Sequence, residues 1–286
     1  MSENTAHRQT LKIPKPFLIT AKILQATSHK LAARFAMKVF TTSVKFKLPK
    51  REEEMDRKSR QELVLIPSIK KSINVYHLGE SPKKVLLVHG WSGRGTQLVS
   101  IADKLVKAGY STLSFDAPAH GKSTGKTSDM TEFITAILQL EQQYGPFEFA
   151  IGHSLGAMAV LNAIKQGLKV KRAVIIGSGD VIRDIMMDFT QKLGMNIAIG
   201  ELMIKMFEKK FGETINNYSA YIAAQAVHIP VLVFHDENDT DVPVSAAHHI
   251  YKHLKDAQLV ITHGLGHRKI LGDKAVIKQI TDFLLS

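Results

Sequence analysis

The sequence predicts an α/β protein built on a doubly wound, mostly parallel sheet, with a helical insertion in its second half. Short, continuously apolar segments recur after residue 60, and an amphipathic segment of helical periodicity follows most of them. Strands that alternate with helices require right-handed crossovers, which arrange the strands in parallel. At 286 residues, of which 44% are hydrophobic, the chain is long enough to form one such domain with an insertion.

The basic charge of the chain is concentrated at its N-terminal end. The whole sequence has a net charge of +12, and residues 1–60 hold 14 Lys/Arg and 5 Asp/Glu. These residues carry a net charge of +9, which leaves only +3 for residues 61–286. A nucleic-acid-binding surface spread over the whole chain is therefore not expected.

Residues 1–60 are predicted to form a basic helical N-terminal extension. Residues 17–40 have apolar side chains at helical spacing, with lysine and arginine between them. Such an amphipathic helix could pack on the body of the protein, which we favour, or lie on an anionic membrane surface. Peripheral membrane contact through the basic N-terminus thus stays open. Residues 49–60 are interpreted as a charged linker or a solvated helix.

The elements expected after residue 60 begin with a hairpin of two strands at the sheet edge, where a proline is tolerated. The strands that the apolar segments predict are 62–69, 73–79, 83–90, 111–118, 147–154, 171–179, 230–239 and 257–264. The helices that the periodicity predicts are 96–110, 128–145, 155–167, 244–255 and 274–285. Ser128 or Asp129 is the expected N-cap of the second of these helices, and Gly145 follows its end.

Residues 181–226 interrupt this alternation, because their pattern is helical throughout and they hold five of the ten methionines. They divide the core into residues 61–180 and 227–286. We expect this segment to form a helical cap over the carboxyl-terminal edge of the sheet, where open α/β sheets bind ligands. Its apolar side chains either form the core of the cap or line a pocket for an apolar substrate. The candidate substrate-binding residues are Met186, Met203, Met206 and Phe207.

A serine lies between two glycines at the junction of a predicted strand and a predicted helix. The segment Gly152-His153-Ser154-Leu155-Gly156 matches the G-x-S-x-G pattern, in which a tight turn displays a nucleophilic serine. A plain structural turn is the alternative, but the strand–turn–helix context favours a nucleophile. His89 and His153 are expected to shape turns rather than to transfer protons.

An activated serine needs a base and an acid that orients the base, and both types of residue occur later in the chain. The candidate acids, at the end of the strand predicted at 230–239 and in the loop after it, are Asp236, Glu237, Asp239 and Asp241. The candidate bases after the last predicted strand are His263 and His267. Along the chain the serine comes first, the candidate acids next and the candidate histidines last, which is the order found in one known hydrolase topology.

In these motifs the chain resembles the α/β-hydrolase superfamily, in its capped serine esterase and lipase-like branch, over roughly residues 61–286. The segment VHGW (88–91) is similar to the family's oxyanion loop. The segment FDAPAHGKS (115–123) is similar to a family turn in which Ala119 replaces the usual glycine. The resemblance favours Asp239, which lies four residues before a proline, as the acid. It favours His267, in GLGHR, as the base.

The resemblance implies acyl transfer. Ser154 would attack a carbonyl carbon, His267 would act as the base that Asp239 orients, and the N–H groups of Trp91 and Leu155 would bind the oxyanion. It implies a carboxylesterase-like serine hydrolase that acts on a small-molecule ester with an apolar acyl group, without a metal or an organic cofactor. The alternative is a non-catalytic protein of the same fold that binds a small apolar ligand or a protein partner.

Two further patterns are set aside. Residues 120–127 approach a phosphate-binding loop, but His120 stands where its first glycine is required. His249 and His253 lie one helical turn apart without an evident third ligand, so no metal site is predicted. The chain has no cysteine, no apolar run long enough to span a membrane and no visible signal peptide, so a cytoplasmic protein is expected.

Overall fold

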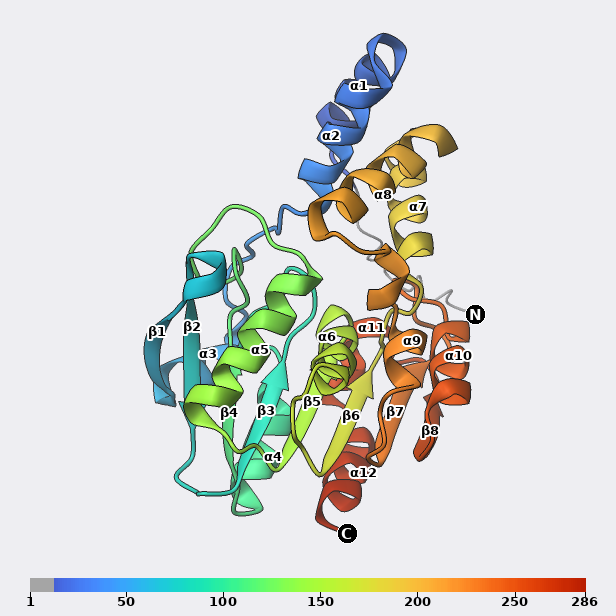
Figure 1. The fold of residues 1–286 in the computed structure, drawn as a ribbon. Coiled ribbons are helices and arrows are strands. Elements are labelled where there is room, and N and C mark those ends of the chain that lie inside the picture. Colours follow the sequence, from blue (N-terminus) through green and yellow to red (C-terminus); the bar gives the residue numbers. More distant parts are fainter. Residues whose placement is uncertain (1–12) are drawn as a thin grey trace, which may run out of the picture.

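Eight strands form one sheet in the computed structural model, which describes residues 13–286 (Figure 1). The strand order is β1-β2-β4-β3-β5-β6-β7-β8. Strand β2 runs antiparallel to both of its neighbours, and every other pair is parallel. The strands are β1 (Arg60–Ile66), β2 (Lys71–Leu78), β3 (Lys84–Val88), β4 (Ser111–Phe115), β5 (Phe149–His153), β6 (Arg172–Ile176), β7 (Val231–Asp236) and β8 (Ala257–Thr262). The predicted doubly wound, mostly parallel sheet is confirmed.

Helices alternate with these strands and form a cap beyond them. The α-helices are α1 (Lys15–Thr27), α2 (His29–Phe40), α3 (Lys50–Lys58), α4 (Val99–Lys107), α5 (Met130–Tyr144), α6 (Leu155–Lys165), α7 (Ile182–Lys192), α8 (Ile197–Phe211), α9 (Ala220–Ala224), α10 (Ser245–His253), α11 (Gly266–Lys269) and α12 (Lys274–Leu285). Three short 3₁₀ helices are η1 (Pro67–Ile69), η2 (Ile215–Tyr218) and η3 (Ile270–Gly272). In the described part of the chain, no helix is long and apolar enough to cross a membrane.

Helices cover both faces of the sheet, because the central strands are apolar on both sides. Along β3, Leu86 and Val88 point into a core that α5 and α6 complete. Val85 and Leu87 point into a second core, which α4 and α12 complete. This arrangement leaves the carboxyl ends of the parallel strands beneath the cap (Figure 1).

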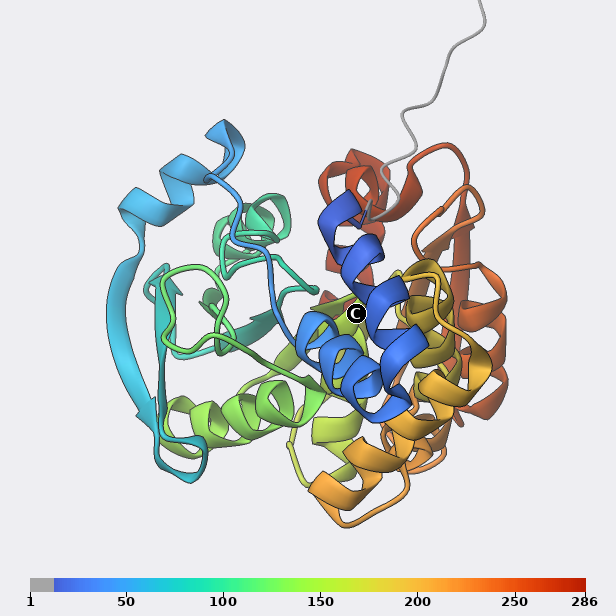
Figure 2. The ribbon, with the colours of Figure 1, turned by 90° about the horizontal axis from the view of Figure 1, so that it is seen from above.

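The N-terminal extension forms two helices instead of the single amphipathic helix expected over residues 17–40. Ser28 interrupts the helical segment, and its side chain accepts a hydrogen bond from the N–H of Leu31 and caps α2. Helix α2 packs against α8, and the ring of Phe40 lies 5.1 Å from that of Phe189 and 6.1 Å from that of Phe207. The extension therefore adds to the cap on the side away from the sheet (Figures 1 and 2).

The insertion between β6 and β7 is mostly helical, as predicted, and forms the rest of the cap. It divides into α7, α8, η2 and α9, because local signals end each helix. Asn196 accepts a hydrogen bond from the N–H of Ile199 and starts α8. Gly212, with φ +76°, ends it in the left-handed conformation that glycine adopts without strain.

The segment from residue 41 to 58, which we call the N-terminal strap, ties the extension to the loop between β3 and α4 at the carboxyl edge of the sheet. Residues 49–60 are not a linker or a purely solvated helix, because Glu52 of α3 is only 2% exposed. Its carboxylate accepts a hydrogen bond from the hydroxyl of Thr96 at 2.8 Å. The N–H of Val44 donates to the hydroxyl of Ser92 at 3.0 Å. The strap thus braces the loop between β3 and α4.

Candidate active site

Ser154 occupies a strained turn between the end of β5 and the start of α6. Its φ of 55° and ψ of −120° are unusual for a residue with a side chain. A hydrogen bond from the N–H of Ser154 to the carbonyl of Ile176, at 2.9 Å, helps to hold this conformation. The neighbouring strand therefore fixes the turn, and the Ser154 side chain is half-buried rather than enclosed.

The two glycines that flank the turn leave no room for a side chain. A Cβ atom on Gly152 would lie closer than 3.0 Å to backbone atoms of Ala157. A Cβ atom on Gly156 would lie closer than 3.0 Å to the carbonyl oxygens of Val88 and His89. The backbone of α6 thus approaches that of β3, which explains why this motif requires glycine at both positions.

We expect Gly156→Ala to lower the free energy of unfolding by about 2 kcal/mol or more, because the backbone oxygens around the new methyl group cannot move aside cheaply. Urea unfolding followed by circular dichroism measures the loss. Gly272→Ala is the matched control, since Gly272 has no atom within 4 Å of the position of its Cβ. Equal stabilities of the two variants would contradict the prediction.

Asp239 and His267 form a buried hydrogen-bonded pair near this turn. The Nδ1–H of His267 donates to Oδ2 of Asp239 at 2.6 Å, and the two side chains are 10% and 1% exposed. The second carboxylate oxygen of Asp239 accepts the N–H groups of Asp241 and Val242. Burial raises the pKa of Asp239, but the hydrogen bond and charge of His267 and these N–H groups outweigh it, so the pKa lies below its ordinary value. Asp239 is therefore an anion that orients the imidazole.

His153 links this pair to the serine turn. Its Nε2–H donates to the backbone carbonyl of His267 at 2.8 Å, and the two rings lie 4.7 Å apart. Gly177, with φ +57°, lies under the ring of His267, since a Cβ atom there would be 3.2 Å from Nδ1. The structure thus brings Ser154, Asp239 and His267 to one edge of the sheet, as expected from their positions after three of its strands.

The competing candidates have other partners. His263 pairs with Glu237 at 2.6 Å, and their side chains are 69% and 47% exposed. Asp236 accepts hydrogen bonds from the hydroxyl of Thr262 and the N–H of Leu265, so it fixes the loop that leads to His267. These contacts leave the Asp239–His267 pair as the one that meets the serine turn.

The backbone N–H groups of Trp91 and Leu155 lie in the two segments that meet around Ser154. A Cβ atom on Gly90 would be 2.9 Å from the Cβ atom of Ser154, which places the Trp91 loop against the turn. Within residues 13–286, neither N–H group donates to an acceptor of the protein. Both are thus free to bind an anionic oxygen, and Leu155 adds the positive end of the α6 dipole.

A residue that the sequence analysis did not single out braces this loop. The buried carboxylate of Asp116, after β4, accepts the N–H groups of Gly95 and Lys122, both at 2.7 Å. Burial raises the pKa of Asp116. Its position directly after a buried strand was the available signal. Ala119, in the same turn, has φ +64°, the left-handed conformation for which the resemblance leads one to expect glycine.

The four candidate substrate-binding residues lie in the cap, but three of them face its interior. Met186, Met203 and Phe207 are at most 2% exposed and belong to the hydrophobic core, so their burial points to packing rather than to substrate contact. Met206 is half-buried and lines a surface pocket between α2 and α8. The prediction that these residues line an acyl site therefore lacks structural support.

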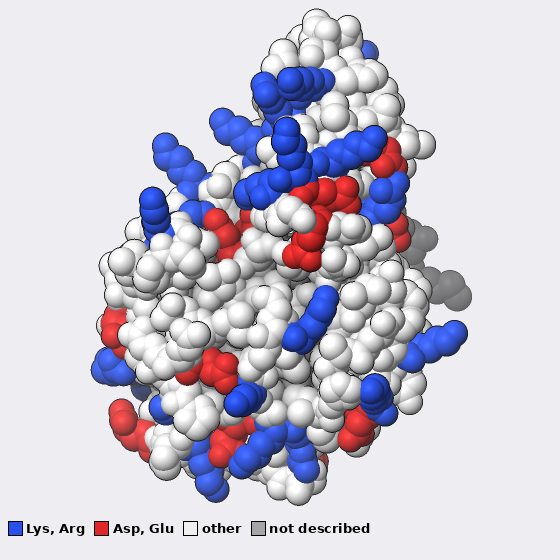
Figure 3. Space-filling view, in the orientation of Figure 1, with Lys and Arg blue, Asp and Glu red and all other residues white. Residues whose placement is uncertain are grey.

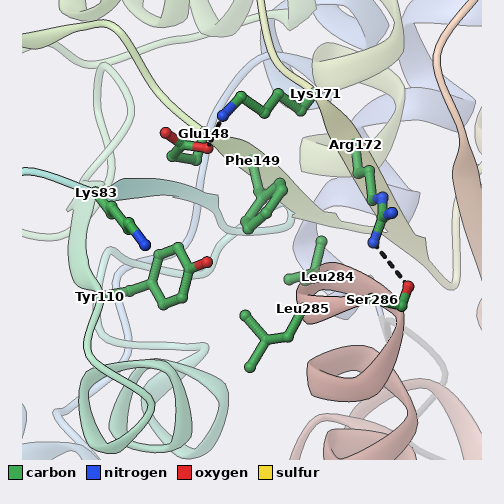
Figure 4. A pocket seen from close by; sticks show the side chains of 9 residues that line it. All are labelled: Lys83, Tyr110, Glu148, Phe149, Lys171, Arg172, Leu284, Leu285 and Ser286. Atoms are coloured by element: carbon green, nitrogen blue, oxygen red, sulfur yellow. Dashed lines mark hydrogen bonds and ion pairs between the residues drawn. The ribbon is translucent and has the colours of Figure 1, made fainter.

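Figure 4 shows a second pocket, which lies at the amino ends of β5 and β6, whereas Ser154 follows the carboxyl end of β5. It is lined by residues at the amino ends of strands, among them Phe149 of β5 and Arg172 of β6, and by the C-terminal residue Ser286. Arg172 donates to the hydroxyl of Ser286 at 2.8 Å. This pocket has no part in the candidate site, because Ser154 follows the other end of β5.

Two buried histidines near the site are held neutral. Burial lowers the pKa of His153 to about 3 and that of His120 to about 4. Each ring has one nitrogen bonded to a backbone carbonyl, of His267 and Pro118 respectively. Among the described residues, the other nitrogen of each ring has no hydrogen-bond partner. Neither ring is therefore suited to act as the general base.

These histidines predict a loss of stability in acid. In the unfolded chain their pKa returns to 6.5, so between pH 6.5 and 4 the unfolded state binds protons that the folded state does not. The free energy of unfolding should fall as the pH falls through this range, by on the order of 3 kcal/mol for His120 alone. Urea unfolding at pH 7 and pH 5 measures the effect, and His120→Gln should reduce the difference. Equal stabilities of the parent protein at the two pH values would contradict it.

No group of three histidine or acidic side chains suited to a metal ion occurs in residues 13–286. His249 bonds to Asp180 at 2.5 Å, and His253 bonds to the carbonyl of His249, so this histidine pair has local partners. The site combines a serine turn, a histidine–carboxylate pair and two free N–H groups, a set of groups suited to nucleophilic acyl transfer.

A model of the Alpha/beta hydrolase family matches residues 85–273, more than half of the chain. Among solved structures, the esterase Pf2001 from Pyrococcus furiosus has a TM-score of 0.66 at 16% identity, covering 85% of this chain and 96% of that one. Est1E from Butyrivibrio proteoclasticus, solved with ferulic acid bound, has a TM-score of 0.61 at 20% identity, covering 78% and 98%. The esterase EaEST from Exiguobacterium antarcticum has a TM-score of 0.62 at 15% identity, covering 79% and 100%. These likenesses show the fold, and no curated protein sequence matches the chain.

Proposed function

Since the chain belongs to the alpha/beta hydrolase family, we propose that it is a serine esterase that cleaves a carboxylic ester with an apolar acyl group. The observation that carries the proposal is the 2.6 Å hydrogen bond between His267 and Asp239, which joins a buried carboxylate to an imidazole beside the strained turn of Ser154. Ser154 would be the nucleophile, His267 the base and Asp239 the orienting acid.

In the first half-reaction, the Ser154 hydroxyl attacks the ester carbonyl carbon while Nε2 of His267 takes its proton. The N–H groups of Trp91 and Leu155 stabilise the negative oxygen of the tetrahedral intermediate. The bond to the alcohol oxygen then breaks, and the alcohol leaves with the proton that His267 returns. In the second half-reaction, water attacks the acyl-serine with the same base and releases the carboxylic acid.

The proposed preference for an apolar acyl group has a local reason. Trp91 and Leu155, on either side of the serine turn, are half-buried apolar side chains packed on the core. An acyl chain that approaches Ser154 would contact these side chains, and removing apolar surface from water favours binding.

A fluorophosphonate probe followed by intact-mass measurement and peptide mapping tests the proposal. We expect one adduct on Ser154 in the parent protein and none in His267→Ala. His263→Ala is the matched control, because that imidazole lies in an exposed pair with Glu237, and it should label normally. Absence of an adduct on folded parent protein would overturn the proposal in favour of a non-catalytic ligand-binding protein. A series of nitrophenyl esters of increasing acyl length would then define the substrate range.

A further inference from the structure

Helix α1 exposes two of its large apolar side chains to solvent. Ile19 and Ile23, one helical turn apart, are 60% and 58% exposed, whereas Ala21 on the inner side is fully buried. A helix that served only to cover the cap would bury the isoleucines and expose the alanine. The outer face of α1 is therefore an apolar surface without a partner among the described residues.

Other exposed apolar side chains adjoin this face. The N–H of Asn196 donates to the side chain of Gln25 at 2.7 Å, which places the start of α8 beside the end of α1. Ile197, the first residue of α8, is 62% exposed, and Leu31 of α2 is 48% exposed. We call Ile19, Ile23, Leu31 and Ile197 the apolar tip. It belongs to the part of the molecule that projects farthest from the sheet on the cap side (Figure 1).

The N-terminal segment that carries most of the apolar tip has a large excess of positive charge. Residues 15–49 contain seven Lys/Arg and no Asp/Glu. In the space-filling view, the end of the molecule above α2 and α8 is largely uncharged, and Lys and Arg gather on the surface just below it, with a smaller group of Asp and Glu beside them (Figure 3). An uncharged end above a band of cations matches a membrane with anionic headgroups, since apolar side chains enter the acyl boundary while cations stay at headgroup depth.

A pocket within this band has the composition that a lipid phosphate would need. It lies between α2 and α8, and its walls carry the cations of Lys30, Arg34 and Lys209. Its remaining lining, Leu202 and Met206, is apolar. Cationic groups over an apolar lining suit an anionic headgroup that remains attached to its acyl chains, whereas free phosphate would use the cations alone.

We propose that the apolar tip and the cations around it dock the protein on the surface of membranes that contain anionic phospholipids. A second copy of the chain is a poorer occupant, because two tips would bring like charges together. Docking in this way turns the cap, and the carboxyl edge of the sheet beneath it, toward the lipid (Figures 1 and 2). The inference does not rest on the proposed esterase activity.

Co-sedimentation of the full chain with vesicles tests the inference. We expect binding to vesicles of phosphatidylcholine mixed with phosphatidylglycerol, little binding to phosphatidylcholine alone, and loss of binding as salt is raised. Ile19→Glu with Ile23→Glu should weaken binding by about tenfold or more. Leu63→Glu with Leu65→Glu is the matched control, since these leucines of β1 are 64% and 58% exposed at the sheet edge, and it should bind normally.

A charge-reversal pair tests the basic part of the surface. Lys30→Glu with Arg34→Glu should reduce binding to the anionic vesicles. The control is Lys104→Glu with Lys107→Glu, exposed on α4, which changes the net charge equally and should reduce binding much less. Thermal unfolding of every variant confirms that it is folded. Equal binding to the two kinds of vesicle, absence of binding by the folded parent, or equal losses in tip and control variants would overturn the inference.

Discussion

Ser154→Ala is expected to lower kcat for ester hydrolysis by about 10⁴-fold or more, because no other group can form the acyl-enzyme. Alanine keeps the Cβ atom of serine, so the strained turn and its hydrogen bond to Ile176 remain, and the variant should unfold at nearly the same temperature as the parent. The loss would therefore report chemistry rather than misfolding. Initial rates with a nitrophenyl ester, together with a thermal melt, provide both measurements.

The matched control for this variant is Ser245→Ala, which removes an exposed hydroxyl at the start of α10. Its kcat should equal that of the parent. If folded Ser154→Ala kept activity within tenfold of the parent, the nucleophile would be another group, and the assignment of the serine turn would be wrong.

Asp239→Asn should lower kcat by about 10³- to 10⁴-fold, because a neutral amide neither holds the Nδ1–H tautomer of His267 nor stabilises its cation. The amide oxygen can still accept the N–H groups of Asp241 and Val242, so the loop geometry should survive. The rate of fluorophosphonate labelling of Ser154 should fall in parallel, since the base acts in that reaction too.

Asp241→Asn is the control for the acid, because Asp241 is exposed and lies two residues away in the same loop. We expect its kcat to remain within about twofold of the parent, as is usual for an exposed surface charge without a role. Equal losses in Asp239→Asn and Asp241→Asn would show that the effect comes from loop charge in general and not from the pair with His267.

The sheet could be predicted from the sequence because each strand carries its own signal. The apolar runs at 83–90 and 147–154 coincide with β3 and β5, since a parallel strand buried on both faces has no polar face to confuse the pattern. The break at Ser28 was missed, because apolar spacing continues across it and only the side-chain cap reveals the end of α1.

The strap was harder to predict, because its buried contacts are tertiary. A run of charged residues such as 49–60 is ordinarily exposed to solvent. The sequence around Glu52 does not indicate that its carboxylate accepts a hydrogen bond from the hydroxyl of Thr96. The methionines of the cap present the opposite problem. Helical spacing identifies apolar side chains such as Met203 but does not distinguish the interior of the cap from the wall of a pocket.

The positions of the candidate site residues followed from topology, whereas their choice needed more. Ser154, Asp239 and His267 each follow a parallel strand, and such strand ends meet at one edge of the sheet. Spacing alone left several carboxylates as candidates for the acid and two histidines as candidates for the base. The structure separates them through contacts, since His263 turns outward to Glu237 and His267 turns inward to Asp239.

The packing of α2 on α8 has a consequence for the order in which the chain assembles during synthesis. Helix α2 ends at Phe40 and α8 begins at Ile197, so α2 leaves the ribosome more than 150 residues before its partner. At about 5–20 residues per second, this interval lasts roughly 10–30 s. Helix α2 is therefore synthesised early but packs against its partner late. Protease should cleave residues 15–40 in ribosome-stalled chains until Phe211 has left the exit tunnel, and protection before that length would show that α1 and α2 fold without α8.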